Sequence, residues 1–596
     1  MLPPNLGISM FEKYDALVCL DFEFRHDDGE PAPQEVACCV AHDLQSDKRW
    51  RLTGEECRRL KNAPYPTGPN ALFICWNAVA ELSCHAALSW KLPAHVLDLM
   101  VCHRAITNGF GVKTNLVAGL NHYGLKHLAA NEKEELRALA MQGGPYSMSE
   151  MQALLEYCET DVIALAELLP KMAPLILTLP NGLPGCLMWG RYMKAVMEMQ
   201  ATGIPLDNSM YQLLHSRWPD ALAALTANAH DQYGVFPDGG FNFNAFENLI
   251  QRLGIPWERT KGGRLNTKLD YWKRQGKMYP RIKTLANVMR TRSQNRELRL
   301  TVGSDGRNRT WLSPFVSKTS RNAPSTNRFV MNCPGWMRGL VTPPPGRALI
   351  VSDYTAEEPW IMGVLAGDDS ILGAYVDDGD FYLNVAHRMD LCERGATKAT
   401  HADLRSNIKI LTLAASYGMG KQSAATLMGV GEGEAASLMR KFRKSHQRYF
   451  EWIKAELNAT WVRGSTHTRF GWPINVPPEP NERSFMNFPL QAHGADILRI
   501  VCCELTERGY NVCFPLHDSV GVEVPLGCEN DAVIQIESIM IEAAGYLGTQ
   551  VPIRVESKIL RPGERYLDSP SAQTEWDSVM AQLGHSSTAT FGRTHY

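Results

Sequence analysis

The strand patterns of this chain fall into two groups, and a long helical stretch separates them. Apolar and β-branched runs at 16–24, 35–44 and 71–78 predict three strands near the N-terminus. Runs at 347–354 and 512–525 predict a strand and a hairpin much later in the chain. With 596 residues, the chain has room for about four domains or subdomains. The sequence therefore predicts a multidomain protein that combines α/β and α+β units.

Composition narrows the class of protein. Hydrophobic residues make up 44% and charged residues 21%, which is the usual mix of a soluble globular protein. The formal net charge is -2, so local basic patches would have to hold any polyanionic partner. We find no apolar run of about 20 residues that could span a membrane, and no secretory signal. The cysteines are scattered without a CxxC motif, which argues against a zinc module and predicts reduced thiols in a cytoplasm.

Four acidic residues and a tyrosine in the N-terminal unit are spaced so that their side chains can meet. Asp21 and Glu23 stand two apart on a predicted strand and therefore share a face. Glu81 lies just after the third predicted strand, and Asp161 follows Tyr157 by four residues on a predicted helix. Converging carboxylates repel one another unless cations neutralise them, and Mg2+ prefers such oxygen ligands. Two ions about 4 Å apart can activate a water for attack on a phosphodiester, and Tyr157 would orient that water.

Each acid pair alone fits solvated side chains at the ends of strands and helices. The spacings DxE, NxxxE and YxxxD, in that order and on those elements, favour a metal site. Asp98, in the segment HVLDLM, is a second candidate for the role of Glu81.

A second constellation joins two aspartates to a basic helix. Asp353 lies at the end of the strand 347–354, and Asp518 lies at the turn of the hairpin 512–525. Both could therefore stand at the ends of neighbouring strands. Between them lies a helical stripe with a four-residue repeat, formed by Arg405, Lys409, Leu413 and Tyr417. Two aspartates can hold two metals against a triphosphate, while basic side chains grip phosphates and a tyrosine ring stacks on a base. Each piece alone fits a solvated face, a polar turn or a capped helix start, but together they favour phosphoryl transfer.

A cluster of basic residues lies between 281 and 309. A helix over 281–300 would present Arg292, Arg296 and Arg299 on one face. We expect this face to lie on duplex phosphates, with salt-sensitive binding. Two further segments are predicted to lack regular structure: a Pro- and Gly-rich linker at 173–186 and a loose tail at 567–596.

These segments resemble the family A, Pol I-like DNA polymerases, and the N-terminal spacing resembles the DEDD exonucleases in their tyrosine subtype. VSDYTAEEPWIMGVLAGD is similar to motif A (DYSQIELRVLA), RSNIKILTLAASYGMG to motif B (RRxxKxxNFGxxYG) and PLHDSVGVEVP to motif C (VHDEVVVEVP). RSFMNFPLQAHGADI matches a further spaced motif, R-x3-N-x3-Q-x4-D. The likeness runs from about residue 16 to about residue 565, with the motifs in the family's order.

The resemblance implies roles for individual residues. Two Mg2+ ions at the polymerase site, for which Mn2+ can substitute, would be held by Asp353, Asp518 and the backbone carbonyl of Tyr354. The residues that would bind the nucleotide are Arg405, Lys409, Leu413, Tyr417, Tyr382 and Glu358. Among them, Glu358 would block a ribose 2′-hydroxyl. The residues that would contact DNA are Arg321, Arg338, Arg483, Asn487, Gln491 and His517. The proofreading residues, with two more Mg2+ ions, would be Asp21, Glu23, Glu81, Tyr157 and Asp161.

The resemblance also implies an activity and a layout. The activity is template-directed DNA synthesis with 3′–5′ exonuclease proofreading, by a monomer acting on primer-template DNA and deoxynucleoside triphosphates away from any membrane. The implied domains are an RNase H-like exonuclease at 1–172, a linker at 173–186, a thumb and palm approach at 187–318, palm at 319–365, fingers at 366–480, palm at 481–566 and a tail at 567–596. We expect no 5′-nuclease domain before the first strand, which resembles compact bacteriophage replicative polymerases and implies the host cytoplasm.

The sequence departs from the family pattern close to both sites. Leu413 stands where motif B has an aromatic residue, which predicts altered handling of 3′-deoxy chain terminators. Ser519 replaces a usual Glu in motif C, Glu357 replaces an Ile in motif A, and Glu81 replaces the usual Asp of the second exonuclease motif. Three alternatives stay open: a polymerase with a silent exonuclease, a non-catalytic DNA-binding accessory protein, and an RNA-processing exonuclease with a helical appendage.

Overall fold

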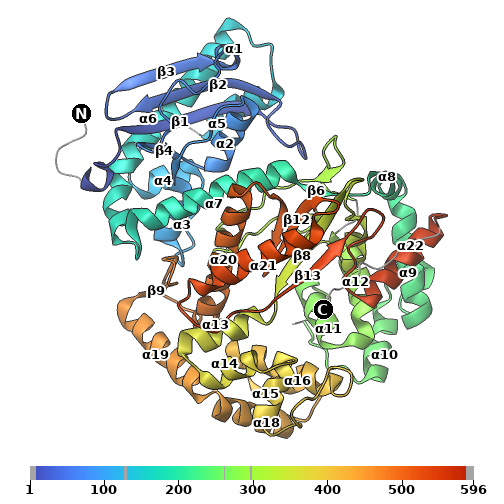
Figure 1. Cartoon of the computed structure of the whole chain (residues 1–596). Helices are drawn as coiled ribbons and strands as arrows, with labels where there is room; N and C mark the ends of the chain where they lie inside the picture. Colours follow the sequence, from blue (N-terminus) through green and yellow to red (C-terminus); the bar gives the residue numbers. More distant parts are fainter. Residues whose placement is uncertain (1–7, 127–129, 261, 295–297, 586–596) are drawn as a thin grey trace.

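Two β-sheets organise the molecule, and they lie in different parts of it. The computed structural model describes residues 8–126, 130–260, 262–294 and 298–585. One sheet belongs to the N-terminal unit at the top left of Figure 1, and the other lies at the centre of a larger body. Helices from the middle of the chain form the lower part of that body (Figure 1). The predicted multidomain mixture of α/β and α+β units is confirmed.

The first sheet has five strands in the order β3-β2-β1-β4-β5. Its central strand β1 pairs antiparallel with β2 and parallel with β4. The strands are β1 (Ala16–Arg25), β2 (Glu35–Asp43), β3 (Lys48–Thr53), β4 (Ala71–Cys75) and β5 (His95–Asp98). The helices are α1 (Gly54–Arg59), α2 (Ala78–Ala87), α3 (Leu99–Thr107), α4 (Leu116–His122) and α5 (Ala130–Gln142). The sequence pattern does not show β3, because it is a polar edge strand, or β5, which has only four residues.

The predicted linker at 173–186 is wrong, because helices run through most of it. α6 (Met148–Thr178) and α7 (Gly182–Thr202) are separated only by a short turn. Pro174 lies inside α6, yet the helix continues because residues such as Ile176 are fully buried on its inner face. Core packing therefore outweighs the local effect of proline here.

The second sheet has four antiparallel strands in the order β11-β12-β8-β13. The strand and hairpin predictions are confirmed by β8 (Arg347–Tyr354), β11 (Asn511–Leu516) and β12 (Ser519–Pro525), and β13 (Val555–Leu560) completes the sheet. α20 (Glu482–Glu507) and α21 (Glu529–Gly545) pack on this sheet. α7 contacts α2 and β5 in the first part and α20 and β11 in the second, so it joins the two.

The helices between β8 and α20 form the lower body in Figure 1. They are α13 (Glu357–Ala366), α14 (Asp369–Val376), α15 (Phe381–Arg388), α16 (Ala402–Ser416), α17 (Lys421–Met428), α18 (Glu432–Ser445) and α19 (Gln447–Arg463). A small hairpin of β9 (Ser465–His467) and β10 (Pro473–Asn475) follows. Short 3-10 helices occur at η1 (Ile8–Phe11), η2 (Pro237–Gly239), η3 (Pro280–Ile282), η4 (Val330–Asn332) and η5 (Gly335–Leu340).

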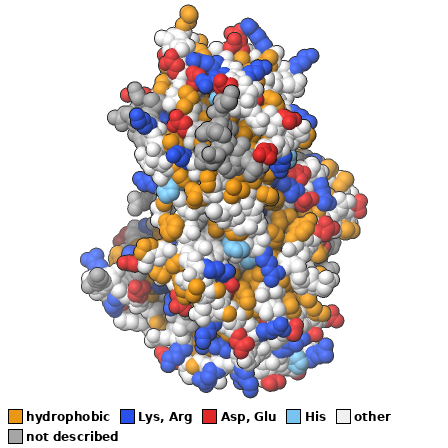
Figure 2. Space-filling view, turned by 90° about the vertical axis from the view of Figure 1, so that its left-hand side faces the viewer, with side chains coloured by type: hydrophobic (Ala, Val, Ile, Leu, Met, Phe, Trp, Pro, Cys, Tyr) orange, Lys and Arg blue, Asp and Glu red, His pale blue; other side chains and the backbone are white. Residues whose placement is uncertain are grey.

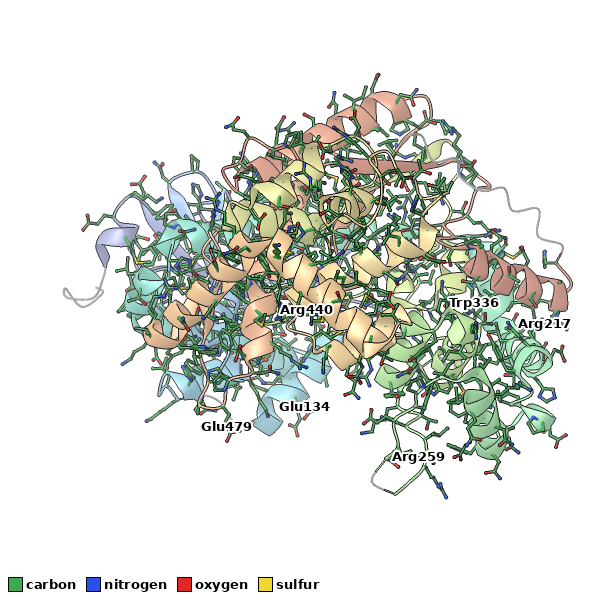
Figure 3. The ribbon with its side chains drawn as sticks, turned by 90° about the horizontal axis from the view of Figure 1, so that it is seen from below. Glu134, Arg217, Arg259, Trp336, Arg440 and Glu479 are labelled. Atoms are coloured by element: carbon green, nitrogen blue, oxygen red, sulfur yellow. The ribbon has the colours of Figure 1, made fainter. Side chains whose placement is uncertain are left out.

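A further group of helices lies at the right of Figure 1. It contains α8 (Asn208–Ser216), α9 (Trp218–Tyr233), α10 (Phe243–Leu253), α11 (Leu269–Met278) and α12 (Lys283–Gln294), beside the short pair β6 (Ile204–Pro205) and β7 (Arg307–Asn308). The predicted loose tail at 567–596 is wrong over its described part, because α22 (Pro570–Gln582) packs on α9 and η5. Trp576 of α22 packs near Trp336, which stacks on Trp218 with ring centroids 6.0 Å apart. Figure 3 shows Trp336 in this part and Arg259 at the tip of a projecting loop.

On the face in Figure 2, basic and acidic side chains are interspersed rather than gathered into one field. No single helix among the described residues is long and apolar enough to cross a membrane. α6 and α7 pass that test only as a pair, by length and composition, and they are bent by 110°.

Candidate active sites

The structure brings the two predicted aspartates of the second sheet together. β8 and β12 pair so that Asp353 lies opposite Ser519, and the Tyr354 amide donates to the Asp518 carbonyl over 3.2 Å. On the other side of β8, Glu556 lies opposite Asp353. Three acidic side chains, from β8, from β13 and from the turn before β12, therefore meet at one end of this sheet, which we call the palm site.

This arrangement raises the pKa of Asp353 to about 8. Loss of water around the carboxyl is the largest cause of this rise, and the charges of Asp518 and Glu556 add to it. The Lys409 ammonium lowers the pKa of Asp353. Part of the Asp353 side chain still reaches solvent. Acids that repel in this way are stabilised by a cation, and a carboxylate pair is the donor set that suits Mg2+. Asp353 and Asp518, with the Tyr354 carbonyl, are the residues that could hold a metal here.

The predicted basic stripe lies on α16, and its two cations reach the same tyrosine ring. Arg405 and Lys409 stand over the ring of Tyr382, at 5.4 and 5.8 Å from its centroid. Arg405 also donates from Nε to Asp380 over 2.5 Å, and Asp380 caps the first turn of α15. Burial raises the pKa of the Tyr382 phenol to about 12, so the ring offers the cations a neutral face.

At the other end of the stripe, a polar network ties three elements together. The Tyr417 hydroxyl donates to Glu358 of α13, and Arg321 Nη2 lies 3.4 Å from the other Glu358 oxygen. Gln491 Nε2 of α20 lies 3.5 Å from the Tyr417 hydroxyl. Leu413, one turn before Tyr417, is half-buried. Predicted nucleotide and DNA residues therefore meet at one point beside the palm site.

The four predicted acids of the N-terminal unit also converge, and we call this group the acid cluster. It consists of Asp21 and Glu23 on β1, Glu81 on α2 and Asp161 on α6. Burial raises the pKa of each of these carboxyls, and charge repulsion within the cluster raises it further for Asp21, Glu23 and Glu81. Asp21 Oδ2 and Glu81 Oε2 are buried and have no hydrogen-bond partner among the described residues. These oxygens are available to a cation.

The other two predicted residues near this cluster differ in role. Tyr157, one turn before Asp161, is buried. Burial raises the pKa of its phenol, and the charges of the acid cluster raise it further. Asp98 instead accepts hydrogen bonds from the amides of Ala78 and Val101, at 2.7 and 3.1 Å, and caps α3. Asp98 is therefore a structural residue, and Glu81 is the acid that faces the cluster.

Sequence reasoning missed one member of this site. Lys133 of α5 places its ammonium 2.5 Å from Asp161 Oδ1 and 5.4 Å from the centroid of the Tyr157 ring. The α5 segment is polar and has no motif that singles out this lysine. Among the described residues, no three acidic, histidine or thiol side chains are already arranged as a metal cage. A metal at the cluster would therefore need water or substrate oxygens, or a shift of the side chains present.

Comparison with known proteins identifies the second part of the chain. Residues 277–562 match the family model "DNA polymerase family A". This segment belongs to DNA polymerase family A. It contains the whole palm site, α16 and the Tyr417 network. The family assignment that the motifs implied is therefore confirmed for these residues.

Individual relatives are similar to this chain over more residues than the family A segment contains. The chain is 23% identical over 424 residues to "DNA polymerase I, thermostable" of Thermus aquaticus, which covers 64% of this chain and 48% of that protein. It is 23% identical over 502 residues to DNA polymerase I of Lactococcus lactis, covering 79% and 55%. The chain thus spans about half the length of these relatives.

A solved structure shows the same fold over nearly the whole chain. It is the POL domain of Pol1 from M. smegmatis in complex with DNA primer-template and dNTP. The TM-score is 0.69 at 18% identity, and the match covers 94% of this chain and 98% of that one. The likeness therefore includes the N-terminal unit as well as the family A segment.

Predicted DNA contacts on α20 and the hairpin lie beside the palm site of the family A segment. Arg483, Asn487 and Gln491 follow one another at four-residue intervals on α20, and the buried Asn487 Oδ1 has no hydrogen-bond partner among the described residues. His517 adopts a φ of 58° at the hairpin tip and lines a cavity of about 160 Å³ together with Arg321. These positions could face a duplex.

The predicted basic face over 281–300 is wrong as a continuous helix. α12 ends at Gln294, so Arg299 does not lie on it, and Arg296 lies outside the described residues. Arg292 does lie on α12, but its Nη1 donates to Thr226 and to the Gly239 carbonyl, at 2.8 and 2.9 Å. Its guanidinium therefore holds neighbouring elements together.

Arg338 is also engaged within the protein. It forms an ion pair with Asp568 over 2.7 Å, and its side chain is largely buried. A DNA contact by Arg338 would have to replace or share this pair.

A buried acid behind the palm site has no counterpart among the predicted functional residues. Glu357 is almost fully buried, and neither carboxylate oxygen has a hydrogen-bond partner among the described residues. Burial and then the charge of Asp518 raise its pKa well above the usual range, while Arg321 opposes the shift. Gly494 of α20 makes room for it, because a Cβ there would lie 2.7 Å from Glu357 Oε2.

Proposed function

We propose that this protein is a template-directed DNA polymerase that adds deoxynucleotides to a primer 3′ end. The observation that carries the proposal is the palm site: two aspartates at adjacent strand ends, near a helix that carries Arg405 and Lys409 and ends at Tyr417. The family A segment and the complex of the structural neighbour with primer-template and dNTP support it. The substrates follow from the same likeness.

Each group at the palm site has a part in this proposal. Two Mg2+ ions, when bound to Asp353 and Asp518, would neutralise the triphosphate and lower the pKa of the primer hydroxyl. Lys409 and Arg405 would bind the triphosphate oxygens as charge-assisted donors. Glu358, held by Tyr417 and Arg321, would close the space beside the sugar and so exclude a ribose 2′-hydroxyl.

We also propose that the N-terminal unit is a 3′–5′ exonuclease that edits the primer. The acid cluster supports this, since its orphaned buried oxygens fit hard divalent cations and Tyr157 stands one turn from Asp161. The sheet order β3-β2-β1-β4-β5 supports the RNase H-like fold that the resemblance implies. The bacteriophage role and the host cytoplasm stay predictions.

A primer-extension assay in Mg2+ tests both proposals. It uses matched and 3′-mismatched primers, with and without nucleotides, on wild type, Asp353→Ala and Asp21→Ala. We expect Asp353→Ala to lose extension and keep mismatch removal, and Asp21→Ala to do the reverse. No extension by wild type on any template would favour the non-catalytic accessory protein. Extension without any primer shortening would keep the polymerase and favour a silent exonuclease.

A further inference from the structure

Lys133 is the one basic side chain that the described residues bring into direct contact with the acid cluster. α5 packs against β1 and α6, the two elements that carry three of the four acids. The Lys133–Asp161 pair is largely shielded from water, with side chains 14% and 12% exposed. At 2.5 Å the ammonium touches one carboxylate oxygen of a residue that the proposed exonuclease needs as a metal ligand.

The surroundings of Lys133 are almost entirely acidic or neutral. Asp21 and Glu23 face it from β1, and Asp161 and Tyr157 face it from α6. The Lys133 charge stabilises the ionised forms of all three acids, whereas the acids repel one another. The ammonium therefore does the electrostatic work that a metal ion would do in the same place.

The next turn of α5 carries a second basic residue. Arg137 lies four residues after Lys133, on the same helix face. It lines a cavity of about 450 Å³ together with Glu23 of the acid cluster. A second basic side chain therefore lies at the same cavity as one acid of the cluster. Glu134, the next residue after Lys133, is exposed and labelled in Figure 3.

We propose that Lys133 is a built-in counter-ion of the acid cluster that competes with divalent metal for Asp161. The inference rests on the proposed exonuclease function of this cluster. The ammonium is paired with Asp161 in the folded chain, and a metal that binds the same carboxylate would have to displace it. A lysine suits this task because its charge is a point on a flexible four-carbon stem. Lys133 is a positioning residue that sets how strongly the cluster holds metal.

Mn2+ binding measured by electron paramagnetic resonance tests the competition. The full chain is used with Asp353→Asn and Asp518→Asn, which remove the palm ligands, and Lys133→Met is added to it. We expect Lys133→Met to bind Mn2+ about tenfold more tightly, because one competing charge-assisted contact is lost. Lys171→Met, an exposed lysine on α6, is the matched control and should leave the affinity unchanged. Unchanged or weaker binding by Lys133→Met overturns the proposal.

A second measurement keeps the proposal testable if Lys133→Met does not fold. In the wild-type protein, reductive methylation with 13C-formaldehyde is followed by mass spectrometry with and without Mg2+. We expect Lys133 to be protected without metal and to become reactive with it, while Lys171 reacts equally in both. Equal protection of Lys133 in the two conditions overturns the proposal.

Asp21→Asn separates this inference from the exonuclease assignment. Loss of the tight Mn2+ sites in Asp21→Asn, with no change in Lys133→Met, would keep the metal cluster and reject the role of Lys133. No loss of Mn2+ binding in Asp21→Asn would reject the metal cluster itself, and with it the proposed exonuclease.

Discussion

The two acidic sites of this molecule solve the same electrostatic problem in different ways. In the N-terminal unit, three buried acids and the half-buried Asp21 form one cluster, and a lysine from the same unit touches one of them. At the palm site, the acids stand at strand ends, Asp353 reaches solvent, and Lys409 acts from the neighbouring helix α16. A buried cluster needs a cation already in the folded chain, whereas an accessible pair can be left for ions and substrate to neutralise.

Each site also has a buried glutamate without a complete set of hydrogen bonds. Glu81 stands within the acid cluster and feels the charges of Asp21 and Glu23. Glu357 lies behind the palm site, and its two oxygens face into the protein next to Gly494. The first is placed to share a cation, while the second is placed to stay protonated.

The largest expected effect is at the palm lysine. Lys409→Met should lower the rate of primer extension about a thousandfold, because the triphosphate loses a preorganised cation. Primer shortening in the absence of nucleotides should stay at the wild-type rate. Single-turnover extension and trimming assays measure both, with Lys444→Met on α18 as an exposed control. Equal losses in the two assays would mean that the sites do not act separately.

The next effect concerns the glutamate of the acid cluster. Glu81→Gln should lower primer shortening about 10- to 100-fold, because an orphaned oxygen that can face a cation becomes an amide. Glu81→Asp restores the acid that the exonuclease family usually has and should keep more of the activity. Trimming of a single-stranded primer across a Mg2+ titration gives the comparison. Full activity in Glu81→Gln would place this residue outside the metal site.

The smallest effect is one of stability, at the glutamate behind the palm site. The folded protein raises the Glu357 pKa above its ordinary value of 4.5, so the folded state holds a proton that the unfolded state releases. The contribution of Glu357 to stability is therefore full below pH 4.5 and falls as the pH rises from there toward its folded pKa. Glu357→Gln removes this loss and should stabilise the protein by about 1–3 kcal/mol at pH 8.

Denaturant unfolding at pH 5 and pH 8 checks the Glu357 prediction. The gain of Glu357→Gln over wild type should be larger at pH 8. A gain that is the same at both pH values would mean that folding does not shift the Glu357 pKa, and a gain that is larger at pH 5 would mean that the folded protein lowers it.

The sequence predicted well where a local pattern and the tertiary structure agree. The strand that carries Asp353, the hairpin that carries Asp518 and the stripe on α16 all follow from residue periodicity. The linker and tail predictions failed because they relied on Pro174 and on weak periodicity, while burial of residues such as Trp576 decides the structure.

The candidate sites show the same limit. Lys133 could not be found from sequence, because only the packing of α5 on β1 brings it to the acids. Arg292 has the residue type and spacing of a phosphate contact, yet its hydrogen bonds lie inside the fold. A motif predicts which residues carry chemistry, but it does not report which partners compete for them.

The helix α7 limits how the palm site and the acid cluster can move relative to each other. It is packed along both parts of the molecule and is about 31 Å long at 1.5 Å per residue over its 21 residues. Such a helix acts as a strut, so neither site can swing toward the other without breaking its packing. Under the proposed function, the primer end must therefore move from the palm site to the acid cluster. The distance between the two sites then sets how many base pairs must melt before the primer end can reach the cluster.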